Sequence, residues 1–294
     1  MNWKPTYEIE KPPEEPSSWK QYEQVVKAEW TVLLNRNPSP SEKEVQTFLE
    51  KHPSMVPGAF GFIGGESGHY PRLCGLVTQP PLPSYDRRVP DFMWLAQSSD
   101  TDEPVLVEIE APSKRWFTKR GAPTASLTQA LQQIADWKAW FDVPRNVESF
   151  KAFYGLERDS WHMRRFRPAY LLIYGRRAEA SAEPTLTRQR THLFPENVFG
   201  RTYDRLEPNP KAHDLVCLKA IRSGVFEVIS VPPTLKWSPM LAEERAHIRG
   251  WDAAILANPH ISPKRKDFLV RRRPYWEEWG LRNERGVINT RDEE

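Results

Sequence analysis

The chain has 294 residues, enough to bury a full core in one large domain with an appendage. Its formal net charge of +3 does not by itself indicate nucleic-acid binding. The two cysteines, Cys74 and Cys217, lack CxxC spacing and predict neither a zinc site nor a disulfide framework, so we interpret them as structural thiols. No apolar run approaches the ~20 residues that cross a bilayer, and the first residues lack a signal-peptide apolar region. We therefore expect a cytoplasmic protein without membrane contact.

The first part of the chain predicts helices. We expect residues 1–40 to form an N-terminal extension, with a proline-rich linker before a helix at about residues 19–35. Ser41 and, three residues later, Glu44 match the capping box that begins a helix, which would run to His52. A Gly- and Pro-rich stretch follows, with one short strand expected near its end, at Leu76-Val77-Thr78.

Two short apolar segments, residues 89–95 and 105–112, read as strands that carry acidic groups, and the polar run 98–103 reads as the turn between them. Ionised carboxylates are seldom found in core strands unless a cation or metal offsets their desolvation. The acidic residues in question are Asp91, Glu108 and Glu110. Side chains along a strand alternate faces at ~3.3 Å per residue, which places Glu108 and Glu110 on one face roughly 6–7 Å apart. The pattern predicts positive charge beside them.

The following segments predict a sheet covered by helices. After Pro123 a helix is expected to about Phe141, with one buried stripe made by Ala130, Ile134, Trp137 and Phe141. Residues 169–175 are almost continuously apolar, as expected for a central strand beside the acidic ones. Later strands are expected at residues 202–206, 214–218 and 225–231. The order of helix, strands, helix and strands predicts an α/β fold with a mixed sheet.

From Pro239 onward the pattern is helical, and we expect residues 236–294 to form a C-terminal extension. One predicted helix carries an apolar side made by Leu241, Ile248, Trp251 and Ile255. A second runs from Ser262 to about Leu281 and interleaves tryptophans with basic residues. Such a helix can contact nucleic acid, or it can pack against protein as a core or oligomer interface, which is the role we favour.

The acidic strands carry a resemblance to known proteins. Pro90-Asp91 followed by Glu108-Ile109-Glu110 resembles the PD-(D/E)xK nuclease motif, with Glu110 standing where that superfamily usually has lysine. More narrowly, the chain resembles the nuclease-like domain of the Shedu anti-phage defence family. The segments that carry this likeness are residues 44–53, 108–112, 117–118, 121, 133–137 and 203–205. The resemblance implies a PD-(D/E)xK restriction-endonuclease-like core at about residues 41–235, with a mixed β-sheet flanked by helices.

The resemblance also implies roles for single residues. Asp91 and Glu108, with the backbone carbonyl of Ile109, would coordinate Mg²⁺ or Mn²⁺, and Glu110 would help to hold a second cation. Gln133 would orient the site or its substrate, since an amide both donates and accepts hydrogen bonds. Lys114 is the candidate to replace the missing lysine, with Lys119 as a weaker one. The expected catalytic set is Asp91, Glu108, Glu110, Lys114 and Gln133.

Two further positions within the resemblance have an ordinary structural interpretation. In such nucleases an acidic residue of the first helix sometimes completes the metal shell, but helix capping accounts equally well for Glu44 and is the role we favour. For Tyr203-Asp204-Arg205 we expect local salt bridging.

Basic residues flank the acidic segment on both sides. Those expected to bind the nucleic-acid backbone are Arg87, Arg88, Lys114, Arg115, Lys119 and Arg120. A cationic rim around an acidic pocket suits a phosphodiester substrate, because the backbone is attracted while the metal is held. Two C-terminal clusters, residues 264–266 and 271–273, fit solvated surface charge equally well.

We therefore expect a metal-dependent nuclease acting on DNA, in the double-stranded form, within anti-phage defence. A homo-oligomer is expected from the resemblance, because a defence nuclease needs restraint against host DNA. Two alternatives stay open. One is a binding module of the same fold that does not cleave. The other is a sensor or scaffold in which the acidic strands hold only salt bridges to Arg87, Arg88 or Lys114.

Overall fold

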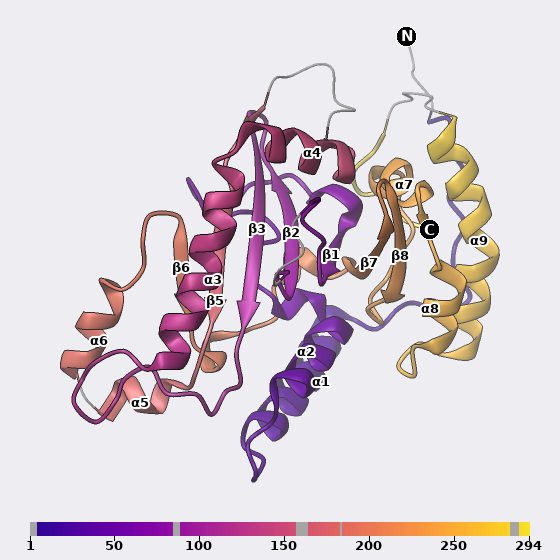
Figure 1. Cartoon of the computed structure of the whole chain (residues 1–294). Helices are drawn as coiled ribbons and strands as arrows, with labels where there is room; N and C mark the ends of the chain where they lie inside the picture. Colours follow the sequence, from indigo (N-terminus) through magenta and orange to yellow (C-terminus); the bar gives the residue numbers. More distant parts are fainter. Residues whose placement is uncertain (1–4, 85–88, 157–163, 183, 283–287) are drawn as a thin grey trace.

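One mixed β-sheet organises the chain (Figure 1). The computed structural model describes residues 5–84, 89–156, 164–182, 184–282 and 288–294. Within them nine strands join in the order β6-β5-β3-β2-β1-β7-β8-β9, with β4 beside β3. Their bounds are Gly75–Thr78 (β1), Phe92–Gln97 (β2), Thr101–Ile109 (β3), Arg165–Phe166 (β4), Ala169–Ile173 (β5), Val198–Arg201 (β6), Val216–Arg222 (β7), Val225–Ser230 (β8) and Ile248–Arg249 (β9). The predicted mixed α/β architecture is confirmed.

The two acidic strands form an antiparallel hairpin, in which Phe92 lies opposite Val107. The turn is shorter than predicted, because β3 already begins at Thr101 and takes in half of the polar run. Buried charge is tolerated there because it has partners: the Glu103 carboxylate accepts hydrogen bonds from the amides of Phe62 and Ile63 at 2.6 and 3.0 Å. The prediction that residues 101–103 belong to the turn is therefore wrong.

On the other side of β3 the strands run parallel to it. The fully buried β5 pairs with β3, as predicted, and β6 pairs with β5. Ile109, Ile173 and Arg201 occupy one row across these three strands, so the strands end together. The strand predicted at residues 202–206 is wrong. The segment instead forms a 3₁₀ turn, Tyr203–Arg205 (η4), closed by a hydrogen bond from the Arg205 amide to the Thr202 carbonyl.

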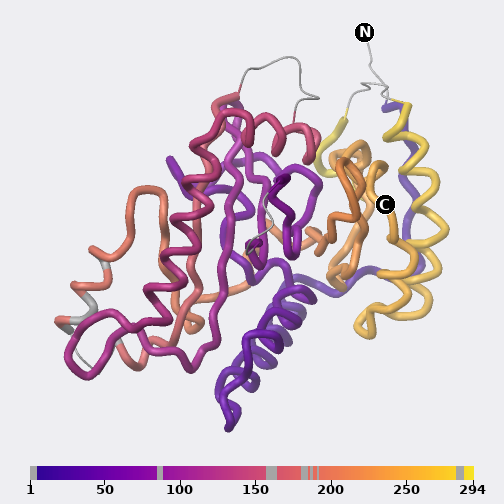
Figure 2. The backbone as a smooth tube through the Cα atoms, in the orientation of Figure 1, coloured from indigo at the N-terminus to yellow at the C-terminus, as the bar shows by residue number. Residues whose placement is uncertain are grey.

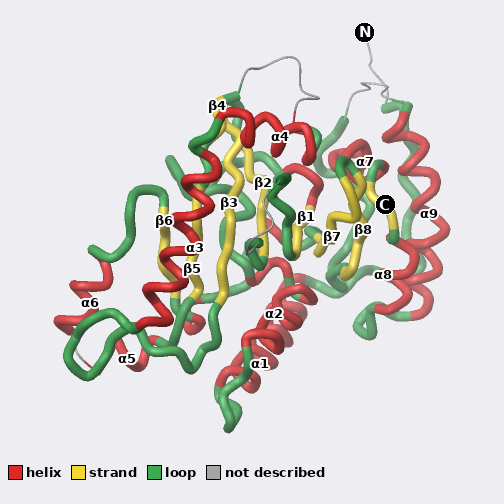
Figure 3. The backbone as a smooth tube through the Cα atoms, viewed as in Figure 1, coloured by secondary structure: helices red, strands yellow, loops and turns green. Residues whose placement is uncertain are grey.

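Helices cover both faces of the sheet (Figure 3). Trp19–Leu34 (α1) and Glu42–Lys51 (α2) pack with one set of alternating strand residues, and Ala125–Phe141 (α3) and Pro144–Tyr154 (α4) pack with the other. All four residues of the predicted α3 stripe are buried, and the predicted capping box of α2 is present. In the chain, Arg177–Ala182 (α5) and Pro184–Thr191 (α6) come after β5 and before β6.

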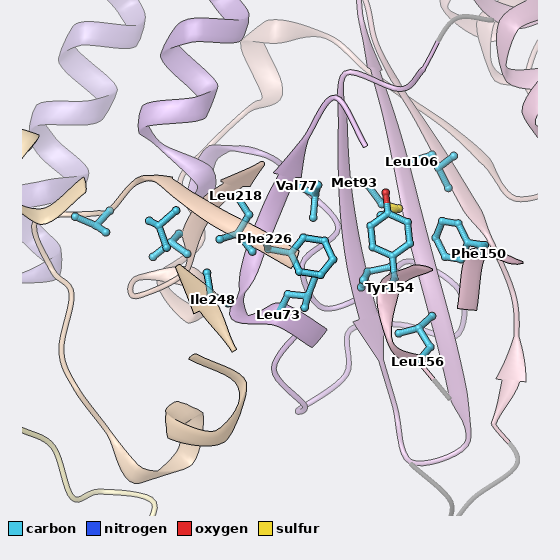
Figure 4. Packing of buried hydrophobic residues seen from close by; sticks show 14 of the residues in the cluster. Leu73, Val77, Met93, Leu106, Phe150, Tyr154, Leu156, Leu218, Phe226 and Ile248 are labelled. Atoms are coloured by element: carbon cyan, nitrogen blue, oxygen red, sulfur yellow. The ribbon is translucent and has the colours of Figure 1, made fainter. Parts of the chain in front are cut away.

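The core on the α3 and α4 face continues across the sheet to its far edge. Tyr154 of α4 stacks on Phe226 of β8 with ring centroids 5.9 Å apart and donates a hydrogen bond to the Pro81 carbonyl at 2.9 Å. Figure 4 shows this ring among residues of β1, β2, β7 and β8. Both cysteines are buried and free, as predicted.

The C-terminal segment packs on the β8 side of the sheet. It contains Pro239–Ala246 (α7), Trp251–Ala257 (α8) and Pro263–Leu281 (α9). The predicted single helix through Ile248 is wrong, because Ile248 pairs in β9 and Gly250 follows with φ +82°, a conformation that interrupts a helix. N-terminal residues run beside α9 (Figure 2), where the ring of Tyr7 lies 5.8 and 5.4 Å from those of Trp276 and Trp279.

Within the described residues, further 3₁₀ turns are formed by Pro53–Met55 (η1), Arg72–Cys74 (η2) and Pro210–Ala212 (η5). Among the helices of the described residues, none combines the length and apolar character needed to cross a membrane. The domain boundaries at residues 40 and 235 stay a prediction.

Candidate active site

The acidic residues meet at the end of the β2–β3 hairpin where β2 begins and β3 ends. Asp91 immediately precedes β2, and its Oδ2 accepts a hydrogen bond from the amide of Ile109 at 2.8 Å. Alternation along each strand places Asp91 and Glu108 on the face that α3 covers, together with Met93 and Leu106. The hairpin therefore brings two carboxyl groups from distant sequence positions side by side.

Glu108 is held by α3. It is 7% exposed, and its Oε2 accepts a hydrogen bond from Nε2 of Gln133 at 2.8 Å. Gln133 is itself buried, because it lies next to the apolar stripe on the side of α3 that faces the sheet. The structure thus brings Gln133 to the acidic pair, which is where an orienting residue must lie.

Burial is the main reason that both carboxyl groups bind protons more tightly than usual. It raises the pKa of Asp91 to about 7, with the charges of Glu42 and Glu110 adding to the shift. Burial also raises the pKa of Glu108 well above its ordinary value, and the charges of Asp91 and Glu110 raise it further. Because Asp91 and Glu108 are hydrogen-bonded to each other, the pair retains a proton near neutral pH.

Glu110 lies directly after β3 and turns toward Lys114. Its backbone is fixed on both sides, because its amide donates to the Ile173 carbonyl at 3.1 Å and its carbonyl accepts from the Tyr203 hydroxyl at 2.5 Å. The Glu110 side chain is buried and forms an ion pair with Lys114 Nζ. A turn closed from the Lys114 amide to the Ala111 carbonyl at 2.9 Å brings the lysine back.

The Lys114 ammonium is stabilised in its charged form. Partial burial by itself would lower its pKa, but the hydrogen bond to Glu110 and the negative charges of Glu110 and Glu42 outweigh burial and raise the pKa. Lys114 therefore carries a positive charge beside Glu110, and its role as the substitute lysine stays a prediction.

One acidic residue near the site was not expected from the sequence. Glu42, in the first turn of α2, is half-buried, and its charge raises the pKa of both Asp91 and Glu108. Glu44 instead caps α2 and forms a salt bridge with Arg36 at 2.5 Å, as the capping prediction required. Both glutamates lie in the same helical turn. Their roles differ because the packing of α2 orients Glu42 toward the acidic pair and Glu44 away from it.

The donor set fits a hard divalent cation through two carboxylates. No group of three or more His, Cys, Asp or Glu side chains is placed to hold a metal ion in the part of the chain that the structure describes. Glu110 forms an ion pair with Lys114, which leaves Asp91 and Glu108 as the pair. Mg²⁺ typically uses one or two carboxylates and keeps several waters. A buried pair that retains a proton is a place where a cation would relieve the repulsion.

The structure describes four of the six residues predicted to form the cationic rim. Arg87 and Arg88 lie outside the described residues, and Arg115 is within 3.5 Å of Glu179. Lys119 and Arg120 are exposed at the tip of a hairpin closed by the bridge between Phe117 and Pro123. Exposed cations at a loop tip are free to reach a nucleic-acid backbone.

The C-terminal basic clusters have partners within the chain. Arg265 pairs with Glu294 at 2.5 Å, Arg271 with Glu10, and Arg273 with Asp252 at 2.7 Å. The Arg272 guanidinium donates to the Glu8 carbonyl. Arg271 and Arg272 hold the N-terminal segment to α9, Arg273 holds α8, and Arg265 holds Glu294, so these contacts are structural.

The site lies within a region matched by a protein family. The family described as "Shedu protein SduA, C-terminal" matches residues 39–206, more than half of the 294 residues. The match begins just before α2 and ends just after η4, so it contains every residue of the acidic site. No curated protein matches the chain.

Proposed function

The chain belongs to the family of Shedu SduA C-terminal regions, which suggests anti-phage defence, and from this premise we propose that it is a metal-dependent nuclease that hydrolyses DNA. The observation that carries the proposal is the buried, hydrogen-bonded Asp91–Glu108 pair at the end of a hairpin, with Gln133 supporting one member. Perturbed carboxyl pairs of this kind are typical of catalytic sites. We further propose that the sheet and its helices form a PD-(D/E)xK-like core.

Asp91 and Glu108 would hold Mg²⁺ or Mn²⁺, with the Ile109 carbonyl as a further oxygen ligand. When bound, the cation polarises the phosphodiester and lowers the pKa of a coordinated water. Asp91 is oriented by the Ile109 amide and Glu108 by the Gln133 amide, so both carboxylates are positioned before substrate arrives. Glu110 forms an ion pair with Lys114 and keeps it charged.

Lys114 would supply the positive charge that the superfamily's lysine usually gives. An ammonium close to the reacting phosphate stabilises the additional negative charge of the transition state. Lys114 reaches this position from four residues beyond Glu110, because the turn at Ala111 folds it back. On this proposal Glu110 positions Lys114, and it can also take part in holding a second cation when one binds.

The decisive experiment measures cleavage of linear and circular double-stranded DNA, single-stranded DNA and RNA with Mg²⁺ or Mn²⁺. We expect cleavage of double-stranded DNA by the parent protein and at least about a hundredfold loss in Glu108→Gln, because removing a charged catalytic group typically costs about that much. Lys114→Met should also lose activity. Glu103→Gln is the matched control, since Glu103 is a buried carboxylate on the same strand but outside the site.

Metal-dependent cleavage that persists in both Asp91→Asn and Glu108→Gln would contradict the proposed site. Glu110→Lys addresses the departure from the superfamily motif. If activity survives or rises in that variant, a lysine at position 110 can replace Lys114. If it is lost, the carboxylate itself is required.

A second candidate is a nucleic-acid-binding module that does not cleave. The observation that favours it is the ion pair between Glu110 and Lys114. In this pair the carboxylate of Glu110 balances the charge of Lys114, so the lysine has less positive charge to offer a reacting phosphate. This alternative predicts that the parent protein binds DNA and divalent metal but leaves every substrate intact, with metal affinity lost in Asp91→Ala.

A further inference from the structure

A cavity lies where α1, the end of α2, β8 and α8 meet, apart from the acidic pair. It has a volume of about 340 Å³, and small-molecule sites typically measure about 300–1,000 Å³. The acidic pair is influenced by Glu42 in the first turn of α2, whereas the cavity begins at Lys51, the last residue of that helix. Because a helix of ten residues is about 15 Å long, the two sites are separate.

The inner wall of the cavity is apolar. Phe226 and Val228 of β8 belong to the core on the α3 face, so strand alternation turns Ile229 to the opposite face, where it is 39% exposed. The apolar residues that line the cavity are Ile229, Val231, Pro233, Ala254, Ala257 and Pro259. A concave apolar surface with an exposed isoleucine suits the flat, apolar part of a ligand.

His52 brings an unpaired nitrogen to this wall. The residue is 7% exposed, and its Nδ1 lies 3.2 Å from the hydroxyl of Tyr22. Its Nε2 points toward Glu29, which also lines the cavity, but the Glu29 carboxylate is 3.6 Å away, beyond hydrogen-bond distance. Burial, with the positive charges of His260 and Lys51 adding to it, lowers the pKa of His52 to about 4. The imidazole is therefore neutral, and a ligand can complete the hydrogen bond that Nε2 lacks.

The mouth of the cavity carries basic groups. Lys51 and His260 are exposed and line the cavity, and neither side chain has a hydrogen bond or an ion pair within the described part of the chain. Glu29 is the only carboxylate among the described lining residues, and its side chain is 45% exposed, so it can turn to solvent. An anionic group at the mouth would therefore meet two basic side chains that have no other partner.

We propose that this cavity binds a nucleoside monophosphate, with its base against Ile229 and α8 and its phosphate toward Lys51 and His260. The site is independent of the proposed cleavage at the acidic pair. A nucleobase has apolar faces for the wall, and its edge carries the donors and acceptors that His52 Nε2 requires. An aliphatic acid would reach Lys51 and the wall but would leave this buried nitrogen unpaired.

Isothermal titration calorimetry of the full chain with AMP, GMP, CMP and UMP tests the proposal. The buffer contains EDTA and no DNA, so neither a bound metal nor cleavage contributes to the heat. We expect at least one of these nucleotides to bind with a Kd below about 1 mM. Its nucleoside should bind about tenfold more weakly, because the charge-assisted contacts to the phosphate are absent. Inorganic phosphate alone should not bind measurably.

Two substitutions with matched controls locate the nucleotide. Ala257→Trp fills the cavity from α8 and should weaken binding by at least about tenfold, whereas Ala253→Trp makes the same change at an exposed position of α8 outside the cavity and should not. Lys51→Met should weaken nucleotide binding about tenfold. Lys43→Met, at an exposed position of the same helix outside the cavity, should keep the parental affinity.

A third substitution separates the base contact from the phosphate contact. His52→Phe keeps a ring but removes Nε2, so it should weaken the nucleotide and its nucleoside by the same factor. Lys51→Met should weaken the nucleotide alone. Thermal unfolding of every variant shows whether the fold is kept, and the two exposed positions, Ala257 and Lys51, test the site even if His52→Phe unfolds.

Three results would overturn the proposal. One is the absence of binding by all four nucleotides up to about 1 mM, whether or not an aromatic acid such as indole-3-carboxylate binds in their place. Another is an affinity that falls equally in Ala257→Trp and Ala253→Trp. The third is loss of nucleotide binding in Glu108→Gln, which would place the nucleotide at the acidic pair. Retained binding in Glu108→Gln, whether or not the parent protein cleaves DNA, supports a second site.

Discussion

At the scale of single residues, the Asp91 carboxyl makes stability depend on pH. Its pKa is about 7 in the folded chain and ~3.9 when unfolded, so between these values the folded state holds a proton that the unfolded state releases. The free energy of unfolding of the metal-free protein should therefore fall as pH rises from about 4 to 7. Glu108, with its raised pKa, acts in the same direction.

Asp91→Asn should remove part of this dependence. The amide side chain keeps an acceptor for Ile109 without adding charge, so we expect the metal-free variant to be more stable than the parent at pH 8 by about 1–2 kcal/mol. Mg²⁺ should raise the parent's unfolding midpoint more at pH 8 than at pH 5.5, and leave the variant unchanged. An equal Mg²⁺ effect at both pH values, or in both proteins, would show that the ion binds elsewhere.

Gln133 offers a second test at this scale, with a neighbour as control. Gln133→Leu leaves Glu108 without its donor at a buried position, so we expect a loss of about 1–3 kcal/mol in stability and about 10–100-fold weaker Mn²⁺ binding. Gln132→Leu makes the same change on the exposed side, where the amide contacts Asp136 at 3.0 Å, and should alter neither. Calorimetric titration with Mn²⁺ decides, and equal affinities in the two variants would remove Gln133 from the site.

The acidic residues of the site differ in how far their roles follow from local sequence. Asp91 and Glu108 stand out in the sequence because a carboxylate in an apolar strand is unusual, whereas Gln133 was expected only from the family resemblance. Glu42 was not expected, because Glu42 and Glu44 lie in one helical turn and both suit a first turn electrostatically. Which of them faces the strands depends on how α2 packs, and that is set by contacts distant in sequence.

At the scale of elements, the β2–β3 hairpin depends on its buried carboxylates as well as on apolar packing. Glu103→Ala removes the acceptor for two backbone amides, those of Phe62 and Ile63, and leaves both unsatisfied. We expect a loss of about 2–3 kcal/mol, because each buried unpaired amide costs about 1 kcal/mol or more. The Mg²⁺ response should be retained, since Glu103 lies at the opposite end of β3 from Glu108.

Chemical unfolding in urea measures this loss, and Asp100→Ala is the control, because Asp100 lies in the exposed turn of the same hairpin. A stability change in Glu103→Ala no larger than in Asp100→Ala would mean that the loop at residues 61–63 is held by other contacts. If Glu103→Ala also lost the Mg²⁺ response, Glu103 would not be independent of the metal site at the other end of β3.

Elements with one dominant local signal were predicted well. The apolar run of β5 and the helical stripe of α3 are self-sufficient patterns, and both appear where expected. The start of β3, the η4 turn and β9 were missed for a shared reason: each is decided by partners elsewhere in the chain. Charged Glu103 resembles a turn residue until the amides of the preceding loop are placed beside it. Ile248 fits a helical pattern in the sequence, but its pairing with the edge of β8 makes it part of a strand.

At the scale of the whole molecule, a buried ion pair ties the C-terminal segment to the sheet. Arg245 of α7 donates to Asp214 Oδ2 at 2.9 Å and to the carbonyl of Lys236 at 2.6 Å. Its guanidinium carbon lies 5.6 and 5.8 Å from the ring centres of Trp237 and Trp251. Both charged groups are almost fully buried. The apolar core on the α3 face also continues without interruption into α7, α8 and α9.

This continuity predicts that the C-terminal segment unfolds together with the sheet. Arg245→Met should cost about 3–5 kcal/mol, because it leaves Asp214 buried without its cation. Adding Asp214→Leu should recover most of that loss, since an apolar pair of similar volume is often no less stable than a buried ion pair. Arg282→Met, which breaks an exposed pair with Glu278, should change stability by no more than about 0.5 kcal/mol.

If helical circular dichroism and tryptophan fluorescence give coincident unfolding curves in all four proteins, the segment is part of one cooperative unit. Two separated transitions in Arg245→Met would instead mean that α7 to α9 form an appendage that the sheet can lose without unfolding.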